Sequence, residues 1–158
     1  MLRSHLLSSM DGIQPLVNLT KLELYDNQIT HLEGLEAMPN LRILDISFNV
    51  IRDMSPVAQC PNLEELYIAQ NKVREIAGLE GLVHLRILDL GANRIRKMEG
   101  LNTLVNLEQL WLGKNKIEHI EGIEQLQHLR QLDVQANRLL GVENISHLMQ
   151  LEELYLAN

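Results

Sequence analysis

The residues that could act as nucleophiles, acids, bases or metal ligands are few and well separated in this 158-residue sequence. His84 and His128 recur at equivalent positions, but the repeat described below separates them by about 10 Å, too far to share one zinc ion. Adjacent acids such as Glu64 and Glu65 point to opposite sides of a strand and cannot form an acid–base pair. Phosphate-loop, nucleophile-turn and zinc-protease motifs are absent. We therefore expect no enzyme, no catalytic residue, no metal, no cofactor and no small-molecule substrate.

A different chemistry, the recognition of another protein, is indicated by acids and aromatic rings that recur every 22 residues. The chain has five aromatic residues, and rings held on a rigid support are the side chains that dominate binding at protein interfaces. The series contains no basic residue. Its members are Glu23, Asp45, Tyr67, Asp89, Trp111, Asp133 and Tyr155.

The elements that position this series are copies of a frame L-x-x-L-x-(L/I/V)-x-x-N. Residues 107–115, LEQLWLGKN, are one copy, and Trp111 is the residue in it that the frame does not explain. A fixed period of this length is typical of a solenoid, in which each repeat buries its apolar side only by stacking on its neighbours. The asparagines that close the frame are Asn27, Asn49, Asn71, Asn93, Asn115 and Asn137.

The frame organises residues 1–158 as a single domain. Residues 1–18 are interpreted as a degenerate first repeat, with His5 where the asparagine would stand. Residues 151–158 begin a further repeat and stop one position before its asparagine, which we interpret as a truncated repeat. The six full repeats are 19–40, 41–62, 63–84, 85–106, 107–128 and 129–150.

The apolar spacing within a repeat predicts a strand followed by a return segment. Leu110 and Leu112 are two residues apart, as on one face of a strand. Ile117, Ile120 and Ile123 are three apart, which suits short 3-10 or irregular backbone. We predict an α/β-class solenoid with a curved parallel sheet on its concave face and such segments on its convex face. An unusual turn is expected before the return segment, at Gly34, Pro56, Gly78, Gly100, Gly122 and Asn144.

The recurring asparagines are predicted to be structural. Their amides should bond backbone groups of the turn and of the adjacent repeat, because an unbonded buried amide would cost about 1–3 kcal/mol. Cys60 shares an apolar position with Leu82 and Leu104, so we expect a small core residue and not a nucleophile. As the single cysteine it forms no intramolecular disulfide, which fits a reducing compartment.

The acid and aromatic series lies between two core positions of each strand, so its side chains should point away from the core. At about 4.8 Å per strand it would form a ridge roughly 29 Å long. None of the five aromatic residues, Phe48 included, occupies an apolar position of the frame. We predict that a protein partner binds this ridge and Phe48. The alternative is that the rings only cover neighbouring strand surface.

A second series carries positive charge. Two interpretations stay open: a solvated edge that balances the acids, or a second docking edge for an acidic segment. The residues stand one or three positions after the asparagines, and they are Arg52, Lys72, Arg74, Arg94, Arg96, Lys116 and Arg138.

Net charge and hydropathy narrow the partner and the compartment. The formal net charge of −7 disfavours nucleic acid and anionic membranes, since phosphate binding relies on clustered cations. No window approaches 18 uninterrupted apolar residues, and the opening MLRSHLLSSM is too broken for a secretory signal. We expect no membrane partner and a location in the nucleus and the cytoplasm.

Strings within the variable positions carry a resemblance. LYDNQI (24–29), LDISFN (44–49), ANRIRKMEGLNTLVNLE (92–108) and LGKNKI (112–117) resemble the leucine-rich-repeat regulatory subunit of protein phosphatase 1, of the sds-twenty-two type. The resemblance covers the chain from about residue 19. It implies a nuclear and cytosolic protein that binds the phosphatase catalytic subunit through a concave leucine-rich-repeat face.

The family's contacts come chiefly from its acid and aromatic strand positions. The matching residues here are Asp45, Tyr67, Asp89 and Trp111. Tyrosine and tryptophan stand where the family often has phenylalanine, and an aspartate stands where it often has glutamate. The family's later repeats and C-terminal cap have no counterpart in this sequence. The repeat frame alone also fits an adaptor of a spliceosomal or axonemal dynein complex, or a repeat array without a partner.

Overall fold

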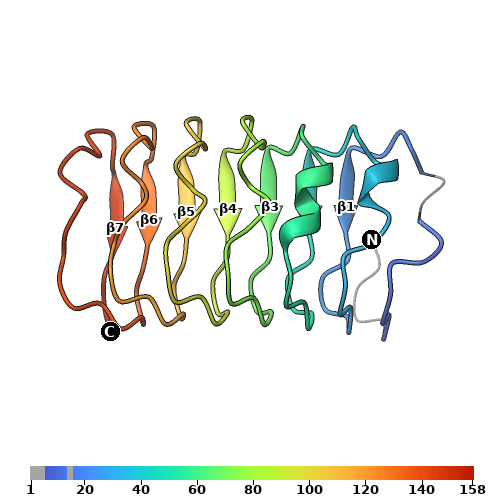
Figure 1. Cartoon of the computed structure of the whole chain (residues 1–158), viewed down its shortest axis with the longest axis horizontal. Coiled ribbons are helices and arrows are strands. Elements are labelled where there is room, and N and C mark those ends of the chain that lie inside the picture. The colour runs from blue at the N-terminus through green and yellow to red at the C-terminus, as the bar shows by residue number, and fades with distance from the viewer. Residues whose placement is uncertain (1–5, 14–15) are drawn as a thin grey trace.

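Short parallel strands form the framework of the protein. The computed structural model describes residues 6–13 and 16–158. Its seven strands make one sheet in which neighbours along the chain are neighbours in space, as Figure 1 shows. This confirms the predicted parallel solenoid with 22-residue repeats. The strands are β1 (Lys21–Glu23), β2 (Ile43–Asp45), β3 (Glu65–Tyr67), β4 (Ile87–Asp89), β5 (Gln109–Trp111), β6 (Gln131–Asp133) and β7 (Glu153–Tyr155).

The register of the sheet is the register of the sequence repeat. Leu66 pairs with Leu88, and Tyr67 pairs with Asp89, each 22 residues further along. The same offset holds between every other pair of neighbouring strands. Each equivalent position of the frame therefore becomes a straight row across the sheet.

The return segments contain little regular structure. Two 3-10 helices, η1 (Leu35–Ala37) and η2 (Ser55–Gln59), lie in the layer opposite the sheet (Figure 1). The other described return segments are turns and irregular backbone, as the three-residue spacing predicts. Gly78 has φ +82°, and a Cβ there would lie 2.3 Å from the Ser55 carbonyl oxygen. Glycine is therefore required at this turn both by backbone angle and by space. In the second repeat Pro56 lies inside η2 instead.

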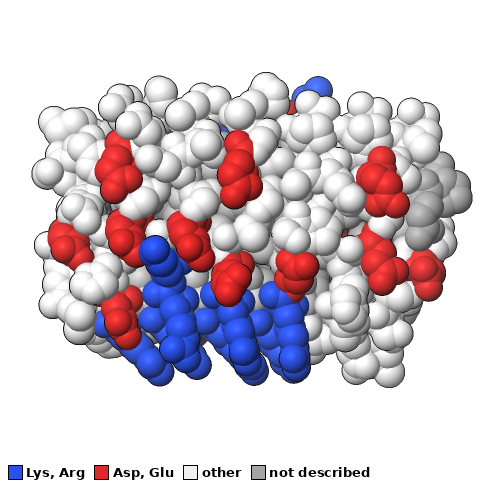
Figure 2. Space-filling model, in the orientation of Figure 1, with Lys and Arg blue, Asp and Glu red and all other residues white. Residues whose placement is uncertain are grey.

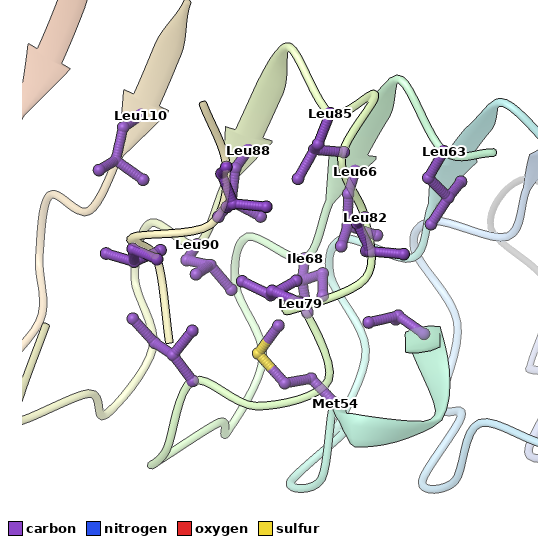
Figure 3. Packing of buried hydrophobic residues seen from close by; sticks show 14 of the residues in the cluster. Met54, Leu63, Leu66, Ile68, Leu79, Leu82, Leu85, Leu88, Leu90 and Leu110 are labelled. Carbon is purple, nitrogen blue, oxygen red and sulfur yellow. The ribbon is translucent and has the colours of Figure 1, made fainter. Parts of the chain in front are cut away.

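Aliphatic side chains fill the space between the sheet and the return segments. Leu66, Ile68 and Leu79 are fully buried and lie among the equivalent residues of the neighbouring repeats (Figure 3). Each contributes about 2 kcal/mol through removal of its apolar surface from water. Cys60 belongs to this core, and burial raises the pKa of its thiol to about 11. It is a packing residue, as expected.

Each repeated asparagine is bonded inside the solenoid. The Nδ2 group of Asn71 donates to the carbonyl oxygens of Ile46, Ile68 and Ala69, at 3.0–3.2 Å. Its Oδ1 accepts the Ile51 N–H at 3.0 Å. One side chain thus ties its own turn to the preceding repeat. The arrangement recurs at Asn49, Asn93, Asn115 and Asn137.

The two ends of the described solenoid differ in cover. At the first end Leu7 takes the place of a repeat isoleucine: its N–H donates to Asn27 Oδ1 and its carbonyl accepts from Gln28. Met10 is buried against the core there. His5, expected at the asparagine position, lies outside the described residues. At the other end Leu154 of β7 is 36% exposed, whereas Leu132 of β6 is fully buried.

Candidate protein-binding surface on the sheet

The outward row of the sheet holds the predicted acids and rings. We call the outer side of the seven strands the sheet face; it is the face expected to be concave. Tyr67 pairs with Asp89 and Trp111 with Asp133, so the register sets rings beside carboxylates on neighbouring strands. The row comprises Glu23, Asp45, Tyr67, Asp89, Trp111, Asp133 and Tyr155.

Three aspartates of this row also hold the backbone. The Oδ1 atom of Asp89 accepts the N–H of Gly91, two residues later, at 2.9 Å. Asp45 and Asp133 make the same bond to the residues two positions beyond them, at 3.0 Å and 2.9 Å. The carboxylates are therefore fixed at the ends of their strands. This role was not predicted from the sequence, although aspartate commonly bonds the backbone N–H two residues later in such a turn.

Asp133 is more deeply set than a surface acid. Only 8% of it is exposed, and a Cβ added to Gly113, two residues beyond the end of the neighbouring strand β5, would come within 2.7 Å of its Oδ2. The absence of a side chain at Gly113 makes the room that this carboxylate occupies. Asp133 is outward-facing, as expected, but little of it can meet a partner directly.

Asp89 has an electrostatic environment that favours its neutral form. Burial raises the pKa of its carboxyl group, and the carboxylates of Asp45 and Asp133 raise it further. The hydrogen bond from Gly91 acts in the opposite direction. A cation brought to this part of the sheet face by a partner would relieve both the desolvation and the repulsion.

The rings are anchored through their polar atoms. The Trp111 Nε1–H donates to Gln109 Oε1 at 3.3 Å, and the Tyr67 hydroxyl donates to Glu65 Oε2 at 2.7 Å. Burial and the bond to Glu65 raise the pKa of Tyr67. Each bond joins residues two apart on one strand, which fixes the ring without crossing to another repeat. Ordered rings lose little conformational entropy on binding.

Trp111 also contacts a ring two strands away. The centroids of Trp111 and Tyr155 are 5.9 Å apart, with ring planes inclined at 33°. Asp133 belongs to the strand between them. The pair gains about 0.5–1.5 kcal/mol beyond its buried area. The rings therefore do cover strand surface, as the alternative interpretation holds, while Trp111 keeps part of its surface open.

A shallow depression of about 320 Å³ lies beside this ring pair on the sheet face. Its lining combines Trp111 and Phe48 with the small residues Ala69, Gly91 and Gly113. Phe48 is 55% exposed and has φ +56°. The same left-handed backbone recurs directly before the other repeated asparagines, so it belongs to the turn of the repeat; the residues are Asp26, Gln70, Ala92, Lys114 and Ala136. Both rings were predicted from the sequence, whereas the further lining residues Gln70, Ala92 and Lys114 were not.

The predicted residues fall into a central group and outliers. Phe48, Asp89, Trp111 and Asp133 line the depression, and Tyr155 contacts Trp111. Asp45 and Tyr67 lie on β2 and β3, next along the row. Glu23 lies on β1, at the first end of the sheet, where it forms an ion pair with Lys21 at 2.8 Å.

Within residues 6–13 and 16–158, no group of three or more His, Cys, Asp or Glu side chains is arranged to hold a metal ion. In the same ranges no helix has the length and apolar character needed to cross a bilayer.

Known proteins with related sequences or folds also consist of leucine-rich repeats. The family described as leucine-rich repeats (two copies) matches residues 17–59 and 61–103. An internalin from Listeria monocytogenes superposes with a TM-score of 0.91 at 30% identity, over 96% of this chain and 45% of its own. A leucine-rich-repeat protein from Leptospira interrogans gives 0.88 at 30% identity, over 92% and 39%.

A third solved structure is covered over more of its length. Internalin C2 from Listeria monocytogenes gives a TM-score of 0.78 at 29% identity, over 98% of this chain and 78% of its own. The chain thus spans less than half the length of the first two structures. No curated protein sequence matches it at a significant level.

Proposed function

The chain belongs to the leucine-rich repeat proteins, and we propose that it is a non-enzymatic scaffold that binds the catalytic subunit of protein phosphatase 1 through its sheet face. Proteins with leucine-rich repeats generally act as protein-binding scaffolds. The proposal adds a partner and a site to that general role. It also places the binding in the nucleus and the cytoplasm.

One observation carries the choice of site: an anchored Trp111 and an exposed Phe48 flank a depression lined by small residues and a half-buried carboxylate. Aromatic anchors next to small residues leave room for a partner's side chain, and a fixed ring retains most of its contact energy. Asp89 adds a preference for a basic group. The site therefore favours a partner surface that combines an apolar side chain with a Lys or Arg.

The choice of partner rests on the resemblance of strings in this sequence to the leucine-rich-repeat regulatory subunit of protein phosphatase 1. Asp45, Tyr67, Asp89 and Trp111 occupy the positions that match the phosphatase contacts of that family. They lie on four successive strands, β2–β5, in one row. A continuous row of matching residues supports binding along the sheet and not at a single point.

A titration with purified phosphatase catalytic subunit tests the proposal. We expect Trp111→Ala and Phe48→Ala each to weaken binding by about 30-fold, because each removes an aromatic anchor worth about 2 kcal/mol. Val105→Ala, which trims an exposed apolar residue outside the strands, is the matched control and should leave the affinity unchanged. Full affinity in both aromatic variants would reject the site.

Affinity capture from cell extract distinguishes the partner. Recovery of the phosphatase catalytic subunit, lost in Trp111→Ala, supports the proposal. Recovery of spliceosomal or axonemal dynein components without the phosphatase would instead assign the same surface to an adaptor. Capture of none of these would leave a repeat array without the proposed partner and would contradict it.

A further inference from the structure

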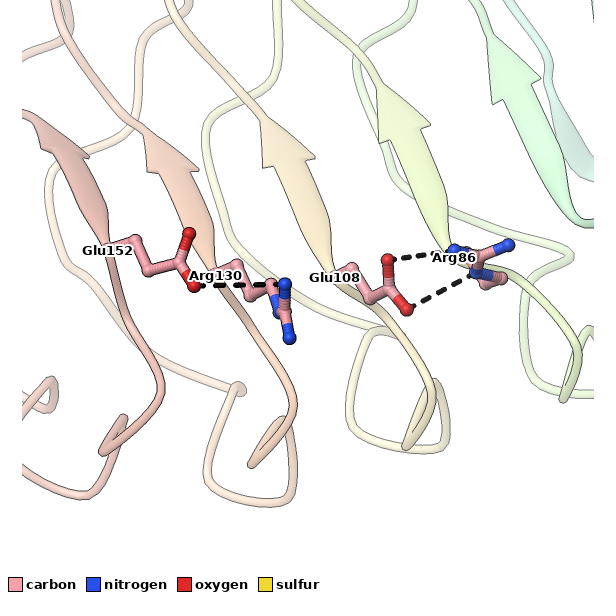
Figure 4. Close-up of polar contacts among 4 residues, drawn as sticks. All are labelled: Arg86, Glu108, Arg130 and Glu152. Atoms are coloured by element: carbon pink, nitrogen blue, oxygen red, sulfur yellow. Dashed lines mark hydrogen bonds and ion pairs between the residues drawn. The ribbon is translucent and has the colours of Figure 1, made fainter.

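The solenoid has two long rims, one beside the start of the strands and one beside their ends, and their charges are organised differently. At the first rim each of three arginines meets a glutamate of the next repeat. The pairs are Arg42–Glu64 at 3.3 Å, Arg86–Glu108 at 3.1 Å and Arg130–Glu152 at 3.7 Å, the last two drawn in Figure 4. We call this the paired rim.

The second rim lies just after the repeated asparagines, and Lys and Arg side chains stand next to one another along it. Figure 2 shows that most of the Lys and Arg side chains visible on this face gather along one long edge of the molecule. In the described part of the chain, none of the Lys and Arg side chains of this second rim has a carboxylate within 4.0 Å. We call this the basic rim: Arg52, Lys72, Arg74, Arg94, Arg96, Lys97, Lys116 and Arg138.

The repeat is what creates the concentration. Equivalent residues recur about 4.8 Å apart across a parallel sheet, so Lys72, Arg94 and Lys116 stand in one row and Arg74 and Arg96 in a second. Eight of the fourteen Lys and Arg residues of a chain with net charge −7 lie on this rim. Like charges at such spacing repel one another, and a bound anion would relieve the repulsion.

The rim has shape as well as charge. Arg74, Arg94, Arg96, Lys97 and Lys116 line a depression together with Glu75 and Glu99. Both glutamates lie farther than ion-pair distance from all of these cations. The guanidinium groups therefore keep their planar pairs of N–H donors available, the arrangement that recognises carboxylates with two parallel hydrogen bonds.

We propose that the basic rim binds an extended segment of a partner protein rich in Asp and Glu. The row from Lys72 to Arg138 covers roughly 14 Å, the reach of about four or five extended residues. No aromatic ring belongs to the rim, so it offers no surface on which nucleic-acid bases could stack, and the net negative charge opposes a long polyphosphate. Short carboxylate-bearing segments meet neither obstacle. The proposal is independent of the phosphatase and of the sheet-face site.

Fluorescence anisotropy with a short fluorescein-labelled peptide of alternating Glu and Ser tests this directly. Arg94→Ala with Arg96→Ala should weaken binding at least about tenfold, since two charge-assisted pairs are lost. Arg42→Ala with Arg86→Ala, on the paired rim, changes the net charge equally and is the matched control. It should change the affinity less than about twofold.

Three results would overturn the proposal. Equal weakening by the two double variants would mean that only net charge matters. Equal binding of a peptide with Gln in place of Glu would remove the role of carboxylates. Tighter binding of a short oligothymidylate than of the acidic peptide would assign the rim to nucleic acid. Thermal melts of both variants verify folding, which exposed substitutions should preserve.

Discussion

Two polar rows run the length of the sheet, and they obey different rules. The asparagine row keeps one residue type from Asn27 to Asn137, whereas the sheet-face row changes between acids and rings from strand to strand. Asn71 is 8% exposed and makes four hydrogen bonds to backbone groups. Trp111 makes one polar contact, within its own strand.

The difference separates residues that build the solenoid from residues that the solenoid displays. A buried side-chain amide needs hydrogen-bond partners for its N–H groups and its oxygen. No other side chain of that size carries both two N–H donors and a carbonyl acceptor. A side chain on the sheet face forms its hydrogen bonds with nearby residues or with water. The residue type at such a position can therefore vary with the partner that binds there. The aspartates of the row stand between these cases, because they bond backbone groups and also place carboxylates on the sheet face.

The largest effect is expected from the asparagine row. Asn71→Ala leaves the Ile51 N–H and three carbonyl oxygens without this partner, and should lower the free energy of unfolding by about 3 kcal/mol or more. Urea unfolding measures the loss. Asn62→Ala is the control, since this exposed asparagine makes a single bond, to Pro39 O. Similar losses in both variants would erase the proposed distinction.

A smaller loss of unfolding free energy is expected at Gly113, which makes room for the Asp133 carboxylate of the sheet-face row. Gly113→Ala places a Cβ within 2.7 Å of Asp133 Oδ2 and should cost about 1–3 kcal/mol. Adding Asp133→Ala should recover part of that loss, which a double-mutant cycle would record as coupling. Gly81→Ala meets no atom within 4 Å and serves as the control. Strict additivity of the two changes would mean that Asp133 does not depend on Gly113.

Trp111→Ala should cost less than a core truncation one residue away. Loss of the contact with Tyr155 accounts for about 1 kcal/mol, a shift of a few degrees in Tm. Leu110→Ala, on the opposite side of β5 and fully buried, should cost about 2–5 kcal/mol. If the tryptophan variant melted as early as the leucine variant, Trp111 would be a packing residue.

The smallest effect concerns pH. Because the pKa of Asp89 is raised in the folded protein, its ionisation opposes folding, and its contribution to stability falls as pH rises from the ordinary value near 3.8 through the folded value. Asp89→Asn can keep the acceptor for Gly91 N–H without the charge. The variant should therefore melt slightly higher than the parent at neutral pH and not at pH below 3.8. A constant difference across pH would contradict the assignment.

Much of the candidate site follows from sequence, but its fine structure does not. The period identifies which residues share a row, so Asp89 and Trp111 could be selected from the sequence. Phe48 could be selected because it is a ring outside the apolar positions of the frame. Neither the ring contact between Trp111 and Tyr155 nor the covering of Asp133 follows from spacing, because side-chain torsions decide how far a ring reaches across the strands. The bond from Gly91 N–H to Asp89 was not predicted, although the two-residue spacing is typical of such bonds.

The sequence by itself determined the repeat, the parallel order of the strands, the aliphatic core and the positions of the asparagines. These follow from a fixed 22-residue period, since stacking is the only way such units can bury their apolar sides. The tertiary structure alone decided which charges meet. Both rims carry arginines in series, yet Arg86 finds Glu108 on the next repeat while Arg94 finds no carboxylate within 4.0 Å among the described residues. Ion pairing depends on distances of a few ångströms between side-chain ends, and a pattern of residue types does not specify those distances.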